Sequence, residues 1–207
     1  VVTVDTPLLG RREKEIRVGF NQRKGVHAAN LLAPEMRDLW PHFDDEDALA
    51  QYISTVRRAN LTWDDVRWLR DATQLPLLLK GILRADDAAQ AVALGVDGLI
   101  ISNHGGRQLD GAIATIEALP AMAKAVGGRV PLIVDGGVRR GSDVLKALAL
   151  GARAVMVGRP LLWGLAVNGE AGAGHVLDLL IQELDLAMAL CGAATLADIT
   201  ADLVWHG

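Results

Sequence analysis

Apolar runs recur along the chain, and most are followed by a polar residue, a glycine-containing turn and an amphipathic helical pattern. Continuous apolar runs of this length predict buried strands that are covered on both faces. Strands that alternate with helices in this way are typical of a parallel sheet flanked by helices. We therefore expect strands near residues 1–5, 76–80, 97–101, 131–135 and 154–158.

An internal repeat is the clearest part of this pattern. A strand pattern that begins at Pro76 leads through a helical pattern to Gly95, and a second copy runs from Pro131 to Gly151. Both copies close with Leu-Gly, and helix C-caps favour glycine. A (β/α)8 barrel and an open doubly wound sheet both place ligands at the carboxyl ends of such strands. The regular repeat favours the barrel, and no glycine-rich dinucleotide fingerprint follows the first strand.

Five strands cannot close an eight-stranded barrel. The chain also begins inside a β-branched run, Val1–Asp5, which has the pattern of a core strand. We therefore expect residues 1–207 to be the C-terminal part of one α/β domain, a (β/α)8 TIM barrel, with about three strands supplied by a missing N-terminal part. Residues 21–47 lack periodicity, which predicts a variable lid loop, and residues 48–59 have a helical pattern. After the last strand we expect a short helix and then a longer one near 172–191.

Composition adds few constraints. The 207 residues are 51% hydrophobic with a formal net charge of -4, which suits a globular domain and argues against a general nucleic-acid surface. The single cysteine, Cys191, excludes an internal disulfide framework, and we expect it to be buried at the end of an apolar helix. No apolar stretch has the length of a membrane span. We expect a cytoplasmic location, with a peroxisomal or membrane-associated one left open.

Residues 102–111, Ser-Asn-His-Gly-Gly-Arg-Gln-Leu-Asp-Gly, carry the most distinctive chemistry. They place a histidine and an arginine in a glycine-rich turn directly after a buried strand. The imidazole of His104 can accept a proton near neutral pH, and the guanidinium of Arg107 can bind a carboxylate through two parallel hydrogen bonds. Asp5 could orient His104 and stabilise its charged form, and Lys80 could stabilise a developing anion.

The last two strands predict a phosphate site. Gly158 and Arg159 follow the last strand and precede a helix, so that backbone amides and a guanidinium can bind an anion together. The turn 135–139 on the neighbouring strand would face the same site. The whole set fits proton abstraction next to a carboxylate, assisted by a phosphate-bearing cofactor that takes electrons. No metal site is expected, because the other histidines are scattered: His27, His42, His175 and His206.

Two other interpretations stay open from the residues alone. Lys80 could be the Schiff-base amine of a phosphate-binding isomerase or aldolase, although this would not explain the pair His104 and Arg107. The chain could also be a non-catalytic, truncated half-barrel that binds phosphate ligands or a complementary chain.

Several motifs appear in one order along nearly the whole chain. The most specific is Ser-Asn-His-Gly-Gly-Arg-Gln-Leu-Asp at 102–110. It is accompanied by Thr-Val-Asp-Thr-Pro at 3–7, Leu-Gly-Arg-Arg at 9–12, Leu-Lys-Gly at 79–81, Asp-Gly-Gly-Val-Arg-Arg-Gly at 135–141 and Val-Gly-Arg-Pro at 157–160. In these motifs the chain resembles the FMN-dependent α-hydroxy-acid oxidase/dehydrogenase family, which includes glycolate oxidase, lactate oxidase, mandelate dehydrogenase and flavocytochrome lactate dehydrogenase.

The resemblance implies an FMN-binding barrel, present here from about the fourth strand onward, that oxidises an L-2-hydroxy acid to the 2-oxo acid. It implies that His104 is the base, that Asp5 is paired with it, and that Arg107 and Arg12 bind the substrate carboxylate or line its pocket. The implied cofactor contacts are Thr3, Lys80, Ser102, Asp135, Gly136, Gly137, Val138, Arg139, Gly158 and Arg159.

The resemblance leaves the electron acceptor open. Oxygen, which would make the protein an oxidase, is favoured, and a membrane- or cytochrome-linked dehydrogenase is the alternative. Removal of the α-hydrogen as a proton or as a hydride stays open as well, because His104 takes a proton in both routes. The resemblance further implies a homo-oligomer, expected to be a tetramer, and a pocket completed by the missing N-terminal part.

Overall fold

The computed structural model describes residues 1–19 and 60–205. The chain divides into two compact units, one formed by Val1–Thr6 with Thr62–Gly207 and the other by Pro7–Leu61. Among the described residues of the second unit, helix α1 (Glu13–Arg17) is the one regular element. The lid loop predicted at 21–47 and the helix predicted at 48–59 lie outside the described residues.

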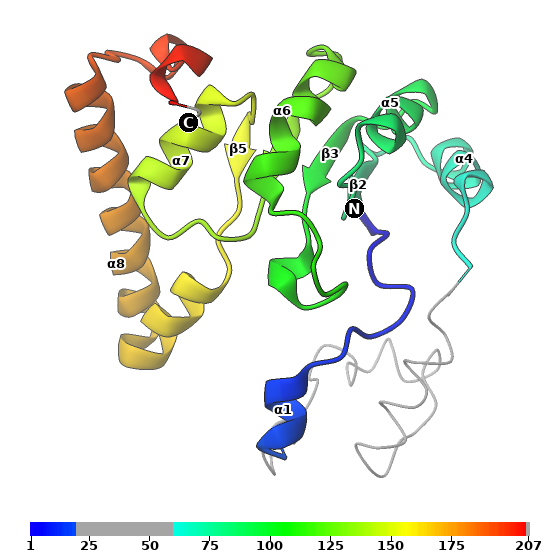
Figure 1. Cartoon of the computed structure of the whole chain (residues 1–207), viewed down its shortest axis with the longest axis horizontal. Coiled ribbons are helices and arrows are strands. Elements are labelled where there is room, and N and C mark those ends of the chain that lie inside the picture. The colour runs from blue at the N-terminus through cyan, green and yellow to red at the C-terminus, as the bar shows by residue number, and fades with distance from the viewer. Residues whose placement is uncertain (20–59, 206–207) are drawn as a thin grey trace. The chain divides into compact units, whose positions relative to one another are not determined.

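The first unit contains a parallel sheet of five strands in sequential order (Figure 1). The strands are β1 (Val2–Thr3), β2 (Leu78–Lys80), β3 (Gly98–Ile101), β4 (Leu132–Val134) and β5 (Ala154–Val155). All five predicted strands are therefore confirmed, although each is shorter than its apolar run. The register is continuous, so that the carboxyl ends of the strands lie along one edge of the sheet.

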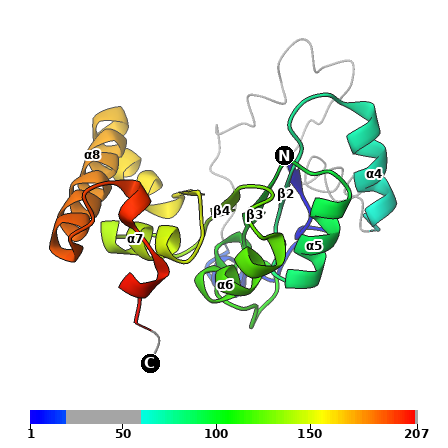
Figure 2. The same cartoon turned by 90° about the horizontal axis from the view of Figure 1, so that it is seen from above.

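Helices cover the sheet on the outside, and Figure 2 shows them following one another around it. Because β–α–β crossovers are right-handed, a sheet in sequential order keeps its helices on one face, as in a barrel, whereas a doubly wound sheet reverses its order. The observed order therefore agrees with part of a (β/α)8 barrel. The helices are α4 (Trp63–Ala72), α5 (Ala85–Ala93), α6 (Thr115–Val126), α7 (Gly141–Ala149) and α8 (Arg159–Cys191), with short 3-10 turns η2 (His104–Gly106), η3 (Leu196–Asp198) and η4 (Ala201–Leu203).

Alternate strand residues pack against the helices and form the main core. Leu79 and Leu99 are completely buried, and so are Leu119 and Met122 on α6. Burying a side chain of this size contributes roughly 1.5–3 kcal/mol to folding. The core therefore fixes the strands, and with them the residues that follow each strand.

Local signals set the helix boundaries. The Thr62 backbone amide and hydroxyl both donate to Asp65 at 2.8 Å, which gives α4 a capping box. Gly95 and Gly151 follow α5 and α7 with φ angles of +79° and +107°, as the repeat predicts. The expected short and long helices after the last strand form α8, which kinks at Asn168–Gly169.

The expectation for Cys191 is wrong. Its side chain is exposed at the end of α8, where Leu190 beside it is 79% exposed. Apolar residues at a helix end indicate burial only if another element covers them, and among the described residues that face of α8 is open. In the described part of the chain, no helix is long and apolar enough to cross a membrane.

Candidate active site

The carboxyl ends of four neighbouring strands surround a cavity of about 540 Å³. Lys80 comes from the end of β2, His104 from the turn after β3, Asp135 from the end of β4, and Arg159 from the start of α8 after β5. Because the strands are parallel and in register, residues far apart in the sequence meet at this edge. The cavity is also lined by Gly105, Arg107, Gly136, Gly137, Val138, Arg139, Met156, Val157, Gly158, Pro160 and Leu162.

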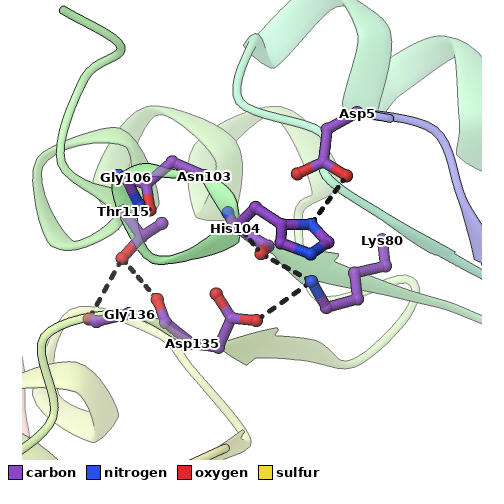
Figure 3. Close-up of polar contacts among 9 residues, drawn as sticks. Asp5, Lys80, Asn103, His104, Gly106, Thr115, Asp135 and Gly136 are labelled. Atoms are coloured by element: carbon purple, nitrogen blue, oxygen red, sulfur yellow. Dashed lines mark hydrogen bonds and ion pairs between the residues drawn. The ribbon is translucent and has the colours of Figure 1, made fainter. Parts of the chain in front are cut away.

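The side chain of His104 contacts that of Asp5 (Figure 3). Its Nδ1 lies 3.3 Å from Asp5 Oδ1, with 34% of the histidine side chain and 12% of the aspartate side chain exposed. An ionised carboxylate can only accept a hydrogen bond, so this contact requires the proton on Nδ1. The Nε2 lone pair of a neutral His104 is then available to take a proton from a ligand.

The His104 turn is held by its own polar groups. His104 has a φ of +58°, which is uncommon for a residue with a side chain, and its amide donates to the buried Ser102 Oγ at 3.1 Å. The Asn103 side chain accepts from the Gly106 amide at 3.2 Å and donates to the Ile113 carbonyl at 3.3 Å. The position of the imidazole is therefore set by a tight turn, which is held by hydrogen bonds between its own side chains and nearby backbone groups.

Lys80 lies between two partners below the imidazole. Its Nζ donates to Ser102 Oγ at 2.8 Å and lies 3.2 Å from Asp135 Oδ2, and both charged side chains are 17% exposed. Asp135 Oδ1 is buried, and no group of the described chain donates to it. Thr115 Oγ1 donates to the Asp135 carbonyl at 2.6 Å, which fixes the turn after β4. The orphaned oxygen leaves Asp135 able to accept a hydrogen bond from a ligand hydroxyl.

A second group of residues around the cavity is suited to an anion. Arg139 and Arg159 line the cavity, and Gly158 precedes the first turn of α8, where the positive end of the helix dipole favours negative charge. Arg159 Nη2 also donates to the Gly105 carbonyl at 2.9 Å. The Arg139 guanidinium stacks on the Trp163 ring, 5.6 Å from its centroid. Glycines at 136 and 137 have φ angles of +85° and +82°, so this turn depends on residues without side chains.

Most of the predicted site residues meet at this cavity. Lys80, His104, Arg107, Gly158, Arg159 and residues 135–139 line it, while Asp5 and Ser102 contact lining residues. Thr3 lies on β1 in register with Lys80 but is not among the residues lining the cavity. Arg12 belongs to the other unit, where it lines a separate cavity of about 460 Å³ and lies 3.6 Å from Glu15. The described residues contain no group of three His, Cys, Asp or Glu side chains that could hold a metal ion.

Sequence reasoning assigned no role to Asn103, Gln108, Thr115 or Trp163. Asn103 precedes His-Gly-Gly, a context in which an asparagine side chain often caps a turn, so its role had a local signal. Gln108 lies in the most specific motif but bonds to Asp5, 103 positions away. Thr115 and Trp163 likewise act on residues of other elements, which no local pattern indicates.

A parallel β/α sheet in sequential order, with a His–Asp pair, a lysine and two arginines around a cavity at its strand ends, places the protein in the barrel class with a site for an anionic ligand. The chain belongs to the family described as FMN-dependent dehydrogenase, whose model matches residues 1–206. The cofactor of this family is FMN, and the relatives described below carry the names of hydroxy-acid oxidases.

Two curated relatives and one solved structure illustrate the similarity. The chain is 52% identical over 198 residues to "L-lactate oxidase" of a Nostoc species, covering 96% of this chain and 54% of that protein. It is 50% identical over 207 residues to "2-Hydroxyacid oxidase 1" of Mus musculus, covering 98% and 55%. A mandelate oxidase structure with (S)-mandelic acid matches with a TM-score of 0.80 and 43% identity, covering 97% and 53%. The chain thus spans about half the length of these relatives.

The residues of the cavity fit the ribityl phosphate part of FMN. The orphaned oxygen of Asp135 suits a ribityl hydroxyl, which is a hydrogen-bond donor. Two arginines and the N-terminus of α8 at the same cavity suit a phosphate. A Cβ at position 136 would approach Asn103 Oδ1 to 3.3 Å, so glycine is what permits the close approach of this turn to the His104 turn.

Proposed function

We propose that the protein containing this chain uses FMN to oxidise an L-2-hydroxy acid to the 2-oxo acid. The observation that carries the proposal is the His104–Asp5 pair beside a cavity that is also lined by Arg139 and Arg159, which suit the cofactor phosphate. The names of the relatives support it, since they act on lactate, mandelate or other 2-hydroxy acids.

His104 is the base in this proposal. With Nδ1–H donated to Asp5, its Nε2 accepts a proton from the substrate, either from the α-carbon or from the hydroxyl. Asp5 keeps the ring in this tautomer and stabilises the imidazolium that forms. General-base catalysis by a positioned side chain contributes typically 10²–10⁴-fold to a rate. Bound FMN supplies the chemistry of a two-electron acceptor.

Arg107 and Arg12 bind the substrate carboxylate in this proposal. Arg107 lies three positions after His104 and lines the same cavity, so a carboxylate bound there has its α-carbon within reach of the base. For Arg12 the proposal rests on the family motif at 9–12 alone. A bidentate arginine contact fixes direction as well as charge, which a lysine would not do.

Charge on the cofactor side is balanced by Lys80. Its ammonium, held by Ser102 and Asp135, would stabilise negative charge on the flavin of a bound FMN. The ion pair with Asp135 argues against a Schiff-base role, which requires a neutral amine. The proposed cofactor contacts are Thr3, Lys80, Ser102, Asp135, Gly136, Gly137, Val138, Arg139, Gly158 and Arg159.

The proposal also includes the remaining barrel strands and an oligomer. The described sheet has β1 and β5 as its two edges, and α8 exposes Leu162, Leu165 and Ile181. A further segment of about three β/α units, pairing with both edges, would close the barrel and cover part of this apolar surface. We expect the complete protein to be a homo-tetramer. A cytoplasmic or peroxisomal location stays a prediction, and one rice relative is named peroxisomal.

Anaerobic mixing of the flavin-loaded protein with glycolate, lactate, mandelate and longer 2-hydroxy acids tests the proposal. At least one acid should bleach the flavin absorbance, and His104→Gln should bind FMN yet be bleached at least about a hundredfold more slowly. An unbleached flavin with every acid would contradict the proposal. Admission of air to the reduced protein then tests the acceptor, since an oxidase is reoxidised within its turnover time and a dehydrogenase is not.

A further inference from the structure

We propose that Gln108 is a positioning residue, whose side-chain amide holds the backbone of Asp5 so that the Asp5 carboxylate faces His104. Gln108 Nε2 donates to the Asp5 carbonyl oxygen at 2.8 Å, a bond between residues 103 positions apart. The inference rests on the proposed role of His104 as the base. It adds a residue that is not among those lining the cavity.

The backbone at Asp5 lies just beyond the ladder of β1. The strand itself ends at Thr3, and the Val4 amide makes the next bond, to the Lys80 carbonyl at 2.8 Å. The bond from Gln108 falls one residue further on, at Asp5 itself. The Gln108 bond therefore extends the hydrogen-bonded backbone of β1 to Asp5, whose carboxylate faces His104.

The Asp5 carboxylate depends on this backbone for its direction. Oδ1 has the 3.3 Å contact with His104 Nδ1, whereas Oδ2 is buried and accepts no hydrogen bond from the described part of the chain. A carboxylate bonded through one oxygen is free to turn about χ2, and a small movement of its backbone lengthens an already long bond. Without the Gln108 bond we expect the His104 ring to lose its preferred tautomer.

Gln108 and His104 belong to the same turn, residues 102–111. This turn supplies the base and also supplies the residue that places the partner of the base. The bond from Gln108 therefore links the turn that carries His104 directly to the backbone of the residue that pairs with His104.

The Gln108→Met variant of the complete, flavin-loaded protein tests the inference. Methionine has a similar length and cannot donate. We expect kcat to fall about three- to tenfold, the effect of one lost hydrogen bond, while KM and flavin content change less than about twofold. Long-range ¹H–¹⁵N spectra of histidine-labelled protein should show the His104 proton on Nδ1 in the parent and shared between both nitrogens in the variant. Gln108→Glu, which keeps the shape without an N–H, repeats the test if Gln108→Met is unstable.

A double-mutant cycle with Asp5→Asn distinguishes positioning from a general structural role. If Gln108 acts through Asp5, adding Gln108→Met to Asp5→Asn should change kcat less than about twofold. Gln90→Met, at an exposed position on α5, is the matched control and should match the parent. The inference is overturned by an unchanged kcat and His104 spectrum in Gln108→Met, or by additive losses in the cycle. If the parent oxidises no hydroxy acid, the proposed function fails, and the His104 spectra alone decide the role of Gln108.

Discussion

The carboxylate of Asp5 reaches the imidazole of His104 across a strand that lies between them, with Oδ1 3.3 Å from Nδ1. Asp5 follows β1 and His104 follows β3, and β2 separates these strands in the sheet. The contact is possible because the residue after β2 is a glycine. A Cβ built on Gly81 would lie 2.6 Å from the Asp5 Cβ.

Gly81→Ala should therefore displace Asp5. We expect a loss of roughly 1–3 kcal/mol in the free energy of unfolding, because the added methyl clashes and because Gly81 has a φ of +107°. The kcat should fall as well, since the His104 partner moves. Denaturant unfolding and steady-state kinetics measure the two effects. Gly128→Ala is the control that separates the steric clash with Asp5 from backbone strain, because Gly128 has a φ of +71° and a Cβ built on it would meet nothing within 4 Å. An equal loss of kcat in Gly128→Ala would show that the clash with Asp5 is not the cause.

Lys80→Met should destabilise the protein by roughly 1–3 kcal/mol, because it leaves the Asp135 carboxylate buried with neither of its oxygens paired to a cation. Adding Asp135→Asn should restore part of this stability but not the rate of flavin reduction. Thermal unfolding of the two variants, with the exposed Lys124→Met as a control, measures the coupling. Independent, additive effects would show that the pair contributes nothing to folding.

Trp163→Leu should weaken FMN binding about two- to fivefold. The ring stacks on the Arg139 guanidinium, and an exposed contact of this kind contributes roughly 0.5–1 kcal/mol to keeping the cation in place. Fluorescence titration of the apoprotein with FMN measures the dissociation constant. Trp68→Leu, at a position on α4 that is 66% exposed, is the matched control. The same affinity in both variants would remove Trp163 from the phosphate site.

Glu183→Gln should lower the melting temperature at neutral pH. The Gly141 amide and the Arg140 guanidinium donate to this carboxylate at 2.9 and 2.8 Å, and they lower the pKa of Glu183 below its usual range. Because the folded pKa is lower than the unfolded one, this stabilisation is present above the unfolded pKa and is lost as the pH falls through the folded value. The difference between parent and variant should therefore shrink as the pH falls below the ordinary glutamate pKa of about 4.3, and vanish below the lower pKa of folded Glu183. Glu170→Gln, at an exposed position of α8, should show no such convergence.

Much of the fold follows from local patterns in the sequence. The apolar runs indicate the five strands because only a parallel, helix-covered sheet buries both faces of each strand. Gly95 and Gly151 mark helix ends because each ends its helix with a positive φ. The motif at 102–110 and the arginine at 159 also indicate a site at the strand ends, since the direction of a parallel strand determines where its last residue lies.

Tertiary structure alone decides which side chains touch. The bonds from Gln108 to Asp5 and from Arg159 to Gly105 join residues 103 and 54 positions apart, and no periodicity in the sequence relates them. Glycine is needed at position 81 only because the Asp5 side chain packs against the end of β2 on its way to His104. The apolar surroundings of Cys191 in the sequence predict that it is buried, but it is exposed. An apolar helix end is buried only when another element covers it. Local sequence determines where each strand and helix begins and ends, whereas the contacts at the site depend on the packing of all strands at once.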